Sequence, residues 1–334
     1  MREIGYLAFT DRGAKLAGEL CAALGGTVTD AREQEAFSLR AWTEERFDRC
    51  EALVFVGAAG IAVRAVAPFL KSKASDPAVV SLDEKGNFVV PLVSGHLGGA
   101  NDLARRIASL CGGTAVLSTA TDVSGVFAVD SWARRQGLRL LQPERIKAVS
   151  SRLLSGESVG VYSAFPIRGA PPEGLRLCPV EDADVLVDIG THESGALTLL
   201  PPCLTLGLGC RRGITEEELE AAFHAFLDGS GVRPEAIGAV ASIDRKADEE
   251  GLLRFCQTHG WEPRFFAAAE LRGAEGMFQG SAFVERTVGV DNVCERSAVL
   301  CSGGSLFRPK WARNGVTLAL ACREPELDWS WTDG

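Results

Sequence analysis

The sequence lacks the short motifs that mark several common protein classes. Its ten cysteines lie at least seven positions apart, as Cys203 and Cys210 do, so no Cys-x-x-Cys pair exists for zinc or redox chemistry. A P-loop lysine motif and an H-E-x-x-H zinc motif are also missing. Three of the four histidines, His192, His224 and His259, have no partner at a metal-ligand spacing. We therefore expect no metal site, and reduced thiols in a cytoplasmic protein.

Positive charge and long apolar runs are also scarce. No run of lysine and arginine exceeds two residues, and the formal net charge is −9, which disfavours nucleic acid as a partner. One long apolar stretch, residues 52–70, contains Gly57, Gly60, Arg64 and Pro68. These residues favour a strand, a turn and a helix over a membrane span, so we expect no membrane contact.

Short apolar runs alternate with helical patterns at both ends of the chain. In residues 1–138, strands are expected at 4–9, 52–57 and 114–119, helices at 13–24, 60–70 and 124–136, and a hairpin at 78–93. In residues 201–322, strands are expected at 203–209, 237–242, 264–269 and 315–321, and helices at 215–228, 247–259 and 291–300. This alternation predicts parallel strands joined by helical crossovers.

The stretch between these ends has a weaker pattern. Residues 139–200 are expected to form a small mixed α/β domain that ends at Pro201 and Pro202. Residues 323–334 show no periodicity and are expected to fray. The predicted fold is therefore α/β, with two largely parallel α/β domains joined by a small middle domain.

Residues 94–102, SGHLGGAND, place His96 just before a helix that is expected to begin near Gly98. Glycines there would leave backbone N–H groups open, and the helix dipole favours anions such as a developing oxyanion. The same dipole would lower the pKa of His96 and favour a neutral base. A histidine in a tight turn can equally be a hydrogen-bonded linker.

Two further segments of the N-terminal third carry candidate polar residues. Thr119, Thr121 and Asp122 follow an expected parallel strand, at the edge where ligands bind in open α/β sheets, although Thr121 or Asp122 could simply cap a helix. Arg64 lies in an otherwise apolar helix pattern, which suggests a buried guanidinium paired with an anion or an internal carboxylate.

Two loops are expected after strands of the C-terminal third. Residues 207–213, GLGCRRG, match a dinucleotide loop imperfectly and better suit a loop that presents Arg211 and Arg212 to an anion. Residues 242–252, SIDRKADEEGL, set Lys246 among acidic residues, which suits proton transfer, carboxylate binding or a solvated helix start.

These motifs, with GIAVRAVAPFLKSKASDPAVVSLDEKGNFVVPLVSGHLGGANDLA and TVGVDNVCERSAVL, resemble the cobalt-precorrin-5A hydrolases (CbiG proteins) of the anaerobic cobalamin pathway. The resemblance covers residues 45–322 and includes the order of the segments. It implies that water opens the ring-A δ-lactone of a ring-contracted tetrapyrrole and that the extruded meso carbon leaves with its methyl group as acetaldehyde. It also implies no resident cofactor, because the cobalt belongs to the substrate.

We take His96, Asp122, Lys246 and Glu249 as candidate catalytic residues, with His96 and Asp122 as rivals for the base. The candidate substrate-binding residues are Arg64, Ser94, Gly95, Gly98, Gly99, Asn101, Thr119, Thr121, Gly209, Arg211, Arg212 and Asp244. A non-catalytic tetrapyrrole carrier and a nicotinamide-dependent reductase remain as alternatives. Transient contacts with neighbouring pathway enzymes are a further expectation, and the oligomeric state is open.

Overall fold

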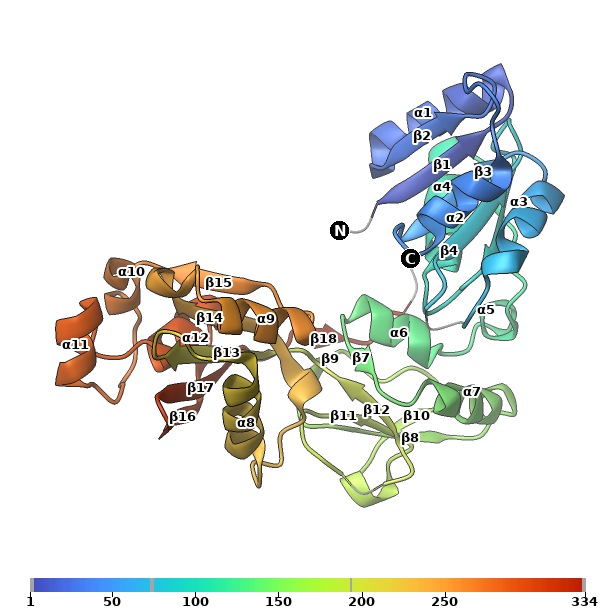
Figure 1. Cartoon of the computed structure of the whole chain (residues 1–334). Coiled ribbons are helices and arrows are strands. Elements are labelled where there is room, and N and C mark those ends of the chain that lie inside the picture. The colour runs from blue at the N-terminus through green and yellow to red at the C-terminus, as the bar shows by residue number, and fades with distance from the viewer. Residues whose placement is uncertain (1–2, 73–74, 193, 332–334) are drawn as a thin grey trace.

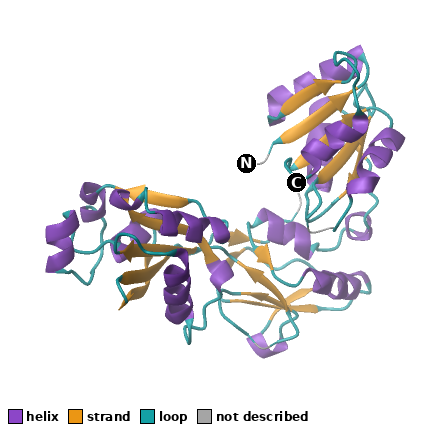
Figure 2. Cartoon of the chain, in the orientation of Figure 1, coloured by secondary structure: helices purple, strands orange, loops and turns teal. Residues whose placement is uncertain are grey.

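The computed structural model describes residues 3–72, 75–192 and 194–331, which form three sheet-centred domains (Figure 1). The N-terminal and C-terminal domains flank the middle domain in this view. Helices and strands mix throughout the chain (Figure 2), and most strand pairs are parallel, which confirms the predicted α/β class.

The N-terminal domain is built on a six-stranded sheet in the order β2-β1-β3-β4-β5-β6. Its strands are β1 (Ile4–Ala8), β2 (Thr27–Asp30), β3 (Ala52–Val56), β4 (Ala78–Leu82), β5 (Phe88–Val93) and β6 (Thr114–Ala115). Its helices are α1 (Asp11–Leu24), α2 (Leu39–Phe47), α3 (Ala59–Val66), α4 (Ala100–Cys111) and α5 (Ala120–Ser124). Helices α1 and α4 cover one face and α2 and α3 the other, so the fully buried β3 lies between two apolar layers.

The direction of β5 decides where the candidate residues lie. Strand β5 runs antiparallel to β4, which confirms the expected hairpin, and β6 runs parallel to β5. The carboxyl ends of β5 and β6 therefore lie at the edge where β1, β3 and β4 begin, which we call the amino edge. Residues 94–99 follow β5, and residues 116–122 follow β6. Both segments therefore begin at the amino edge, rather than at the carboxyl edge of the main parallel strands where ligands were expected.

The middle domain contains residues that the sequence assigned elsewhere. Its sheet has the order β10-β8-β11-β12-β7, formed by β7 (Arg139–Leu140), β8 (Val159–Ser163), β10 (Leu175–Leu177), β11 (Val185–Val187) and β12 (Leu197–Leu200). Helices α6 (Val129–Arg135) and α7 (Ile146–Leu154) pack on it. Residues 127–138, assigned to the N-terminal domain, lie in this core, because Phe127, Val129 and Trp132 are buried against Val149, Leu153 and the sheet. The expected boundary at 138 is therefore too late.

The C-terminal tail is ordered in the described part of the chain, which corrects the expectation that it frays. Strand β18 (Leu327–Asp328) pairs in parallel with β9 (Ile167–Arg168) of the middle domain. Trp329 stacks on Trp132 of α6, with ring centroids 5.2 Å apart, and Leu327 is buried. Aromatic burial therefore fixes a segment that has no periodic pattern; residues 332–334 lie outside the described residues.

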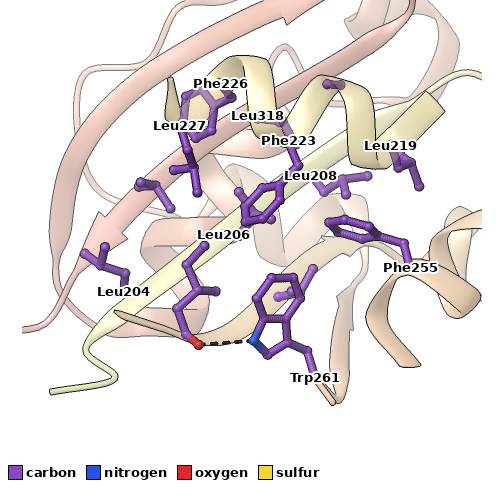
Figure 3. Packing of buried hydrophobic residues seen from close by; sticks show 14 of the residues in the cluster. Leu204, Leu206, Leu208, Leu219, Phe223, Phe226, Leu227, Phe255, Trp261 and Leu318 are labelled. Atoms are coloured by element: carbon purple, nitrogen blue, oxygen red, sulfur yellow. Dashed lines mark hydrogen bonds between the residues drawn. The ribbon is translucent and has the colours of Figure 1, made fainter. Parts of the chain in front are cut away.

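The C-terminal domain has a five-stranded sheet in the order β15-β14-β13-β17-β16. Its strands are β13 (Leu204–Cys210), β14 (Ile237–Ile243), β15 (Pro263–Phe266), β16 (Ser305–Arg313) and β17 (Val316–Cys322). Its helices are α8 (Glu216–Leu227), α9 (Glu250–Thr258), α10 (Ala268–Arg272), α11 (Ala282–Val288) and α12 (Cys294–Ser302). Leucines of β13 pack against Phe223 and Phe226 of α8 and Phe255 of α9, and Trp261 donates its indole N–H to the carbonyl of Ile237 (Figure 3).

Candidate active site

The glycine-rich turn 94–99 connects β5 to α4 through a strained, tightly packed backbone. Ser94 has φ of 57°, and its hydroxyl donates to the carbonyl of Asp76 at 2.9 Å. The amides of Gly99, Ala100 and Asn101 donate to carbonyls of the turn itself at 2.9–3.1 Å. The expectation of amides open to an anion is therefore wrong for Gly99, Ala100 and Asn101, because the turn satisfies these three internally.

His96 is held between two carboxylates. Its Nε2 lies 2.9 Å from Asp122 Oδ2, and its Nδ1 lies 3.3 Å from Asp130 Oδ2. The side chain is only 14% exposed, and this burial lowers the pKa of His96, but the two carboxylates outweigh it and raise that pKa to about 9. The expected neutral base is therefore corrected: at neutral pH the imidazole carries a proton, because two anions act on it more strongly than the helix dipole.

Asp122 is bound by His96, Asn101 and Arg105. Its Oδ2 accepts from Asn101 Nδ2 at 2.8 Å, and its Oδ1 accepts from the Arg105 guanidinium. Asn101 Nδ2 also lies 3.1 Å from Thr119 Oγ1, and Thr121 Oγ1 lies 3.3 Å from His96 Nε2. Burial raises the pKa of Asp122, but His96 and Arg105 outweigh it and lower that pKa to about 2. His96 and Asp122 are thus bonded partners.

The bonding continues through four residues that sequence reasoning missed: Asp102, Arg105, Asp130 and Arg134. Arg105 also contacts Asp102 at 3.2 Å, and Asp102 in turn accepts from Arg134. The result is a chain of alternating charge, which we call the charge ladder, running Asp130, His96, Asp122, Arg105, Asp102, Arg134. The i,i+3 spacing of Asp102 and Arg105 was a usable signal, whereas the contacts to Asp130 and Arg134 depend on tertiary structure.

A large cavity opens beside the charge ladder at the amino edge. It has a volume of about 1270 Å³ and is lined by Gly98 and Gly99 of the turn and by the beginnings of β1, β3 and β4. Four arginines also line it, Arg105, Arg106, Arg134 and Arg135, together with three acidic residues, Glu3, Glu51 and Asp102. Ligand cavities are typically ~300–1,000 Å³, so this one suits a large ligand, and the arginines suit a ligand with several carboxylates.

Arg64 and the remaining glycines of the turn have different roles from those expected. Arg64 is exposed on α3, so the expected buried guanidinium is wrong: the helix turns this position outward while Ala62, Ala65 and Val66 face the core. A Cβ atom at Gly95 would crowd the Asn101 side chain, and one at Gly98 would overlap Ser94. These glycines therefore allow the turn to pack closely.

The C-terminal candidates form a second, separate group at the carboxyl ends of β13 and β14. Lys246 Nζ lies 2.8 Å from Glu249 Oε2, and both side chains are buried. Glu249 Oε1 accepts the amide of Gly213 at 2.9 Å, which ties the GLGCRRG loop to the next loop. Burial raises the pKa of Glu249, but Lys246 and the Gly213 amide outweigh it, so that the pKa lies below its ordinary value.

The exposed arginines of this group are paired with acids. Arg211 contacts Glu218 at 2.6 Å, and Arg212 contacts Asp248 at 2.6 Å. Asp244 is exposed after β14. At Gly209, a Cβ atom would overlap the side chain of Thr317. No hydrogen bond or ion pair joins this group to the charge ladder among the described residues.

The sequence also contains one G-x-S-x-G motif that was not among the expected sites. Its structure differs from that of the same motif in α/β hydrolases. Residues 156–160, GESVG, fit the G-x-S-x-G pattern, which in α/β hydrolases forms a strand-to-helix elbow around the serine. Here the segment begins in the loop after α7 and continues into the first residues of β8. The order is therefore helix to strand, and Ser158 is exposed. The local geometry therefore does not support a serine nucleophile.

Comparison with known proteins assigns the family. Three family models match in chain order: cobalamin synthesis G N-terminal at residues 41–122, cobalamin biosynthesis central region at 127–188, and cobalamin synthesis G C-terminus at 204–321. The cobalt-precorrin-5A hydrolase of Salmonella typhimurium is 34% identical, over 95% of this chain and 97% of that protein. The chain belongs to the cobalt-precorrin-5A hydrolase family.

Other members of the cobalt-precorrin-5A hydrolase family and a solved structure show similar coverage. The Priestia megaterium cobalt-precorrin-5A hydrolase is 30% identical over 85% of this chain and 82% of its own length. A crystal structure of a cobalamin biosynthesis protein G homologue from Sulfolobus solfataricus covers 96% of this chain and 97% of its own, with 22% identity and a TM-score of 0.43. The central family match begins at residue 127, where the core of the middle domain also begins.

The described residues hold neither a candidate metal site nor a candidate membrane span. Within residues 3–72, 75–192 and 194–331, no group of three or more His, Cys, Asp or Glu side chains could hold a metal ion. Among the same residues, no helix is both long and apolar enough to cross a membrane.

Proposed function

We propose that this chain is a cobalt-precorrin-5A hydrolase of cobalamin biosynthesis. The observation that carries this proposal is the 34% identity with a curated enzyme of that name over 95% of the chain. We also propose that the substrate brings its own cobalt, that the enzyme needs no resident cofactor, and that it works in the cytoplasm, where its ten free cysteines stay reduced.

The reaction needs one water molecule and no external oxidant. Water adds to the ring-A lactone carbonyl, and the carbon–oxygen bond of the lactone breaks, which leaves a carboxylate and an alkoxide on the extruded meso carbon. The alkoxide forms the carbonyl of acetaldehyde as the bond from the meso carbon to the macrocycle breaks. The electron pair of that bond passes into the macrocycle, giving cobalt-precorrin-5B.

The cavity at the amino edge is the proposed substrate site. Cobalt-precorrin-5A carries acetate and propionate arms, and four arginines line the cavity. His96 is charged at neutral pH, so its proposed role is to stabilise the tetrahedral oxyanion rather than to accept a proton. The developing oxyanion would share the Nδ1 proton of His96 with Asp130, whose contact, at 3.3 Å, is longer than the 2.9 Å contact with Asp122.

The C-terminal group has a supporting role in this proposal. Arg211 and Arg212 are exposed and could exchange their acidic partners for arms of the substrate, and Lys246 with Glu249 holds the loop that presents them. A nicotinamide loop is not favoured, because Glu249 occupies the Gly213 amide that a phosphate would need. A passive carrier offers no reason for a buried, charged histidine in a ladder whose Asp102, Arg105 and Arg134 line the cavity.

The test is incubation of the purified protein with cobalt-precorrin-5A in the absence of any nicotinamide, with acetaldehyde measured directly. Acetaldehyde release with one water consumed is expected. His96→Ala should lower kcat by ~10²-fold or more, as removal of an oxyanion-stabilising donor does, with a smaller effect on substrate affinity. Tight binding of the substrate without turnover would support a carrier, and a requirement for NAD(P)H would support a reductase.

A further inference from the structure

The charge ladder crosses a domain boundary. Its central residues, His96, Asp122, Arg105 and Asp102, belong to the N-terminal domain. Its two ends, Asp130 and Arg134, lie one helical turn apart on α6, whose apolar face is buried in the core of the middle domain beside Trp132. The middle domain therefore supplies both terminal charges of a ladder whose centre it does not contain.

The contacts at the two ends are specific. Asp130 is 7% exposed, and one oxygen accepts the amide of Ser131 while the other contacts His96 Nδ1. The guanidinium of Arg134 contacts Asp102 and lies so close to Gly99 that a Cβ atom there would overlap it. Arg134 thus lies between the glycine turn and the cavity, and it also lines that cavity.

We propose that Asp130 and Arg134 are positioning residues through which the middle domain completes the active site of the N-terminal domain. Asp130 orients the imidazole of His96 and keeps it charged, together with Asp122 from α5, which Arg105 of α4 neutralises. Arg134 fixes the glycine turn and places a cation at the cavity wall. This inference rests on the proposed function, since it assigns these residues to the same site.

The test compares Asp130→Asn with the wild type by two independent measurements. The first is the pKa of His96, followed by NMR of the labelled imidazole. The second is the pH profile of kcat/KM for acetaldehyde release, which reports groups of the free enzyme. In the wild type the charged form is the active one, so kcat/KM should fall as pH rises through about 9. In Asp130→Asn the NMR pKa and this alkaline fall should both move down by ~1–3 units, and kcat/KM at pH 8 should fall by ~2-fold for one unit and by ~90-fold for three.

A matched control is Asp188→Asn, which makes the same change in another His–Asp contact of the middle domain. Asp188 Oδ2 lies 2.6 Å from His192 Nε2, away from the charge ladder. This variant should keep the wild-type kcat/KM, and its activity should fall at the same alkaline pH as that of the wild type. If Asp130 has a purely structural role, Asp130→Asn should have a lower melting temperature, but its folded fraction should lose activity at the same alkaline pH as the wild type. That result would overturn the inference.

The wild type alone provides a second test that does not depend on a variant folding. The alkaline fall of its kcat/KM and its His96 titration should share a midpoint near pH 9. A His96 that titrates near its ordinary pKa of ~6.5, or an alkaline fall more than one unit from the NMR value, would contradict the inference. Wild-type protein that releases no acetaldehyde would instead overturn the proposed function, while the NMR titration would still report on the contact with Asp130.

Discussion

Lys246 and Glu249 show how a single residue pair can fix a loop. Both side chains are buried, and the carboxylate of Glu249 also receives the Gly213 amide, so two loops after neighbouring strands depend on one ion pair. Burying two charges is costly, and the pair is tolerated because each charge is matched by the other and by hydrogen bonds. Removing one partner would leave the other charge buried without compensation.

Lys246→Met should therefore lower the local stability of the C-terminal domain by ~3–5 kcal/mol. The measurement is amide hydrogen exchange of β13 and β14, which reports the free energy of opening. Arg211→Gln is the control, because the Arg211–Glu218 pair is exposed and should contribute at most ~1 kcal/mol. The double variant Lys246→Met with Glu249→Leu should recover much of the loss, and equal small effects for all variants would contradict this account.

At the scale of the element, α4 has a glycine with positive φ at each end. Gly99 precedes the helix with φ of 82°, and Gly112 follows it with φ of 67°. Space for a Cβ atom is open at Gly112, whereas at Gly99 it is filled by the guanidinium of Arg134. The two positions therefore share the cost of a left-handed backbone but differ in packing.

Gly99→Ala should destabilise the protein by ~1–3 kcal/mol more than Gly112→Ala, because only the first adds an overlap with Arg134. Thermal unfolding of the two variants measures this difference. Because the overlap would displace Arg134 from the cavity wall, Gly99→Ala should also raise the KM for the substrate, while Gly112→Ala should not. Identical melting temperatures would mean that Arg134 moves away at no cost.

The sequence predicted the elements whose patterns are local. The period of apolar residues placed α4, and the turn residues 83–87 placed the hairpin of β4 and β5. The grouping of His96, Asn101, Thr119, Thr121 and Asp122 was also predictable, because both segments follow neighbouring strands. The charge of His96 was not, since it depends on Asp130 from a helix that belongs to another domain.

At the scale of the whole molecule, the middle domain is assembled from distant parts of the chain. Gln136 beside α6 exchanges hydrogen bonds with Asp328, and Trp132 donates its indole N–H to the carbonyl of the same residue. Trp329 then covers Trp132 and Phe127. The tail thus supports the helix that carries Asp130 and Arg134, although it is ~200 residues away in sequence.

Trp329→Ala should loosen α6 and β8 without affecting the C-terminal domain. Truncating a buried tryptophan typically costs ~3–5 kcal/mol, and the measurement is the amide exchange of each domain. Trp311→Ala is the reciprocal control, since Trp311 packs on the core of the C-terminal domain and should change exchange there instead. Acetaldehyde release should fall in Trp329→Ala through the loosened α6. Uniform exchange changes in all domains would argue against a local role for the tail.

The pairing of β18 with β9 also sets an order of events during synthesis. The ribosome makes residues 127–200 before the C-terminal domain, yet the core of the middle domain is closed by residues 327–331, which are made after the C-terminal domain. The C-terminal domain can therefore fold before β18 is available to complete the middle domain. A chain that lacks residues 327–331 would keep His96 and most of the cavity but would lose the support of α6, so catalytic competence would be reached only after these residues have been made.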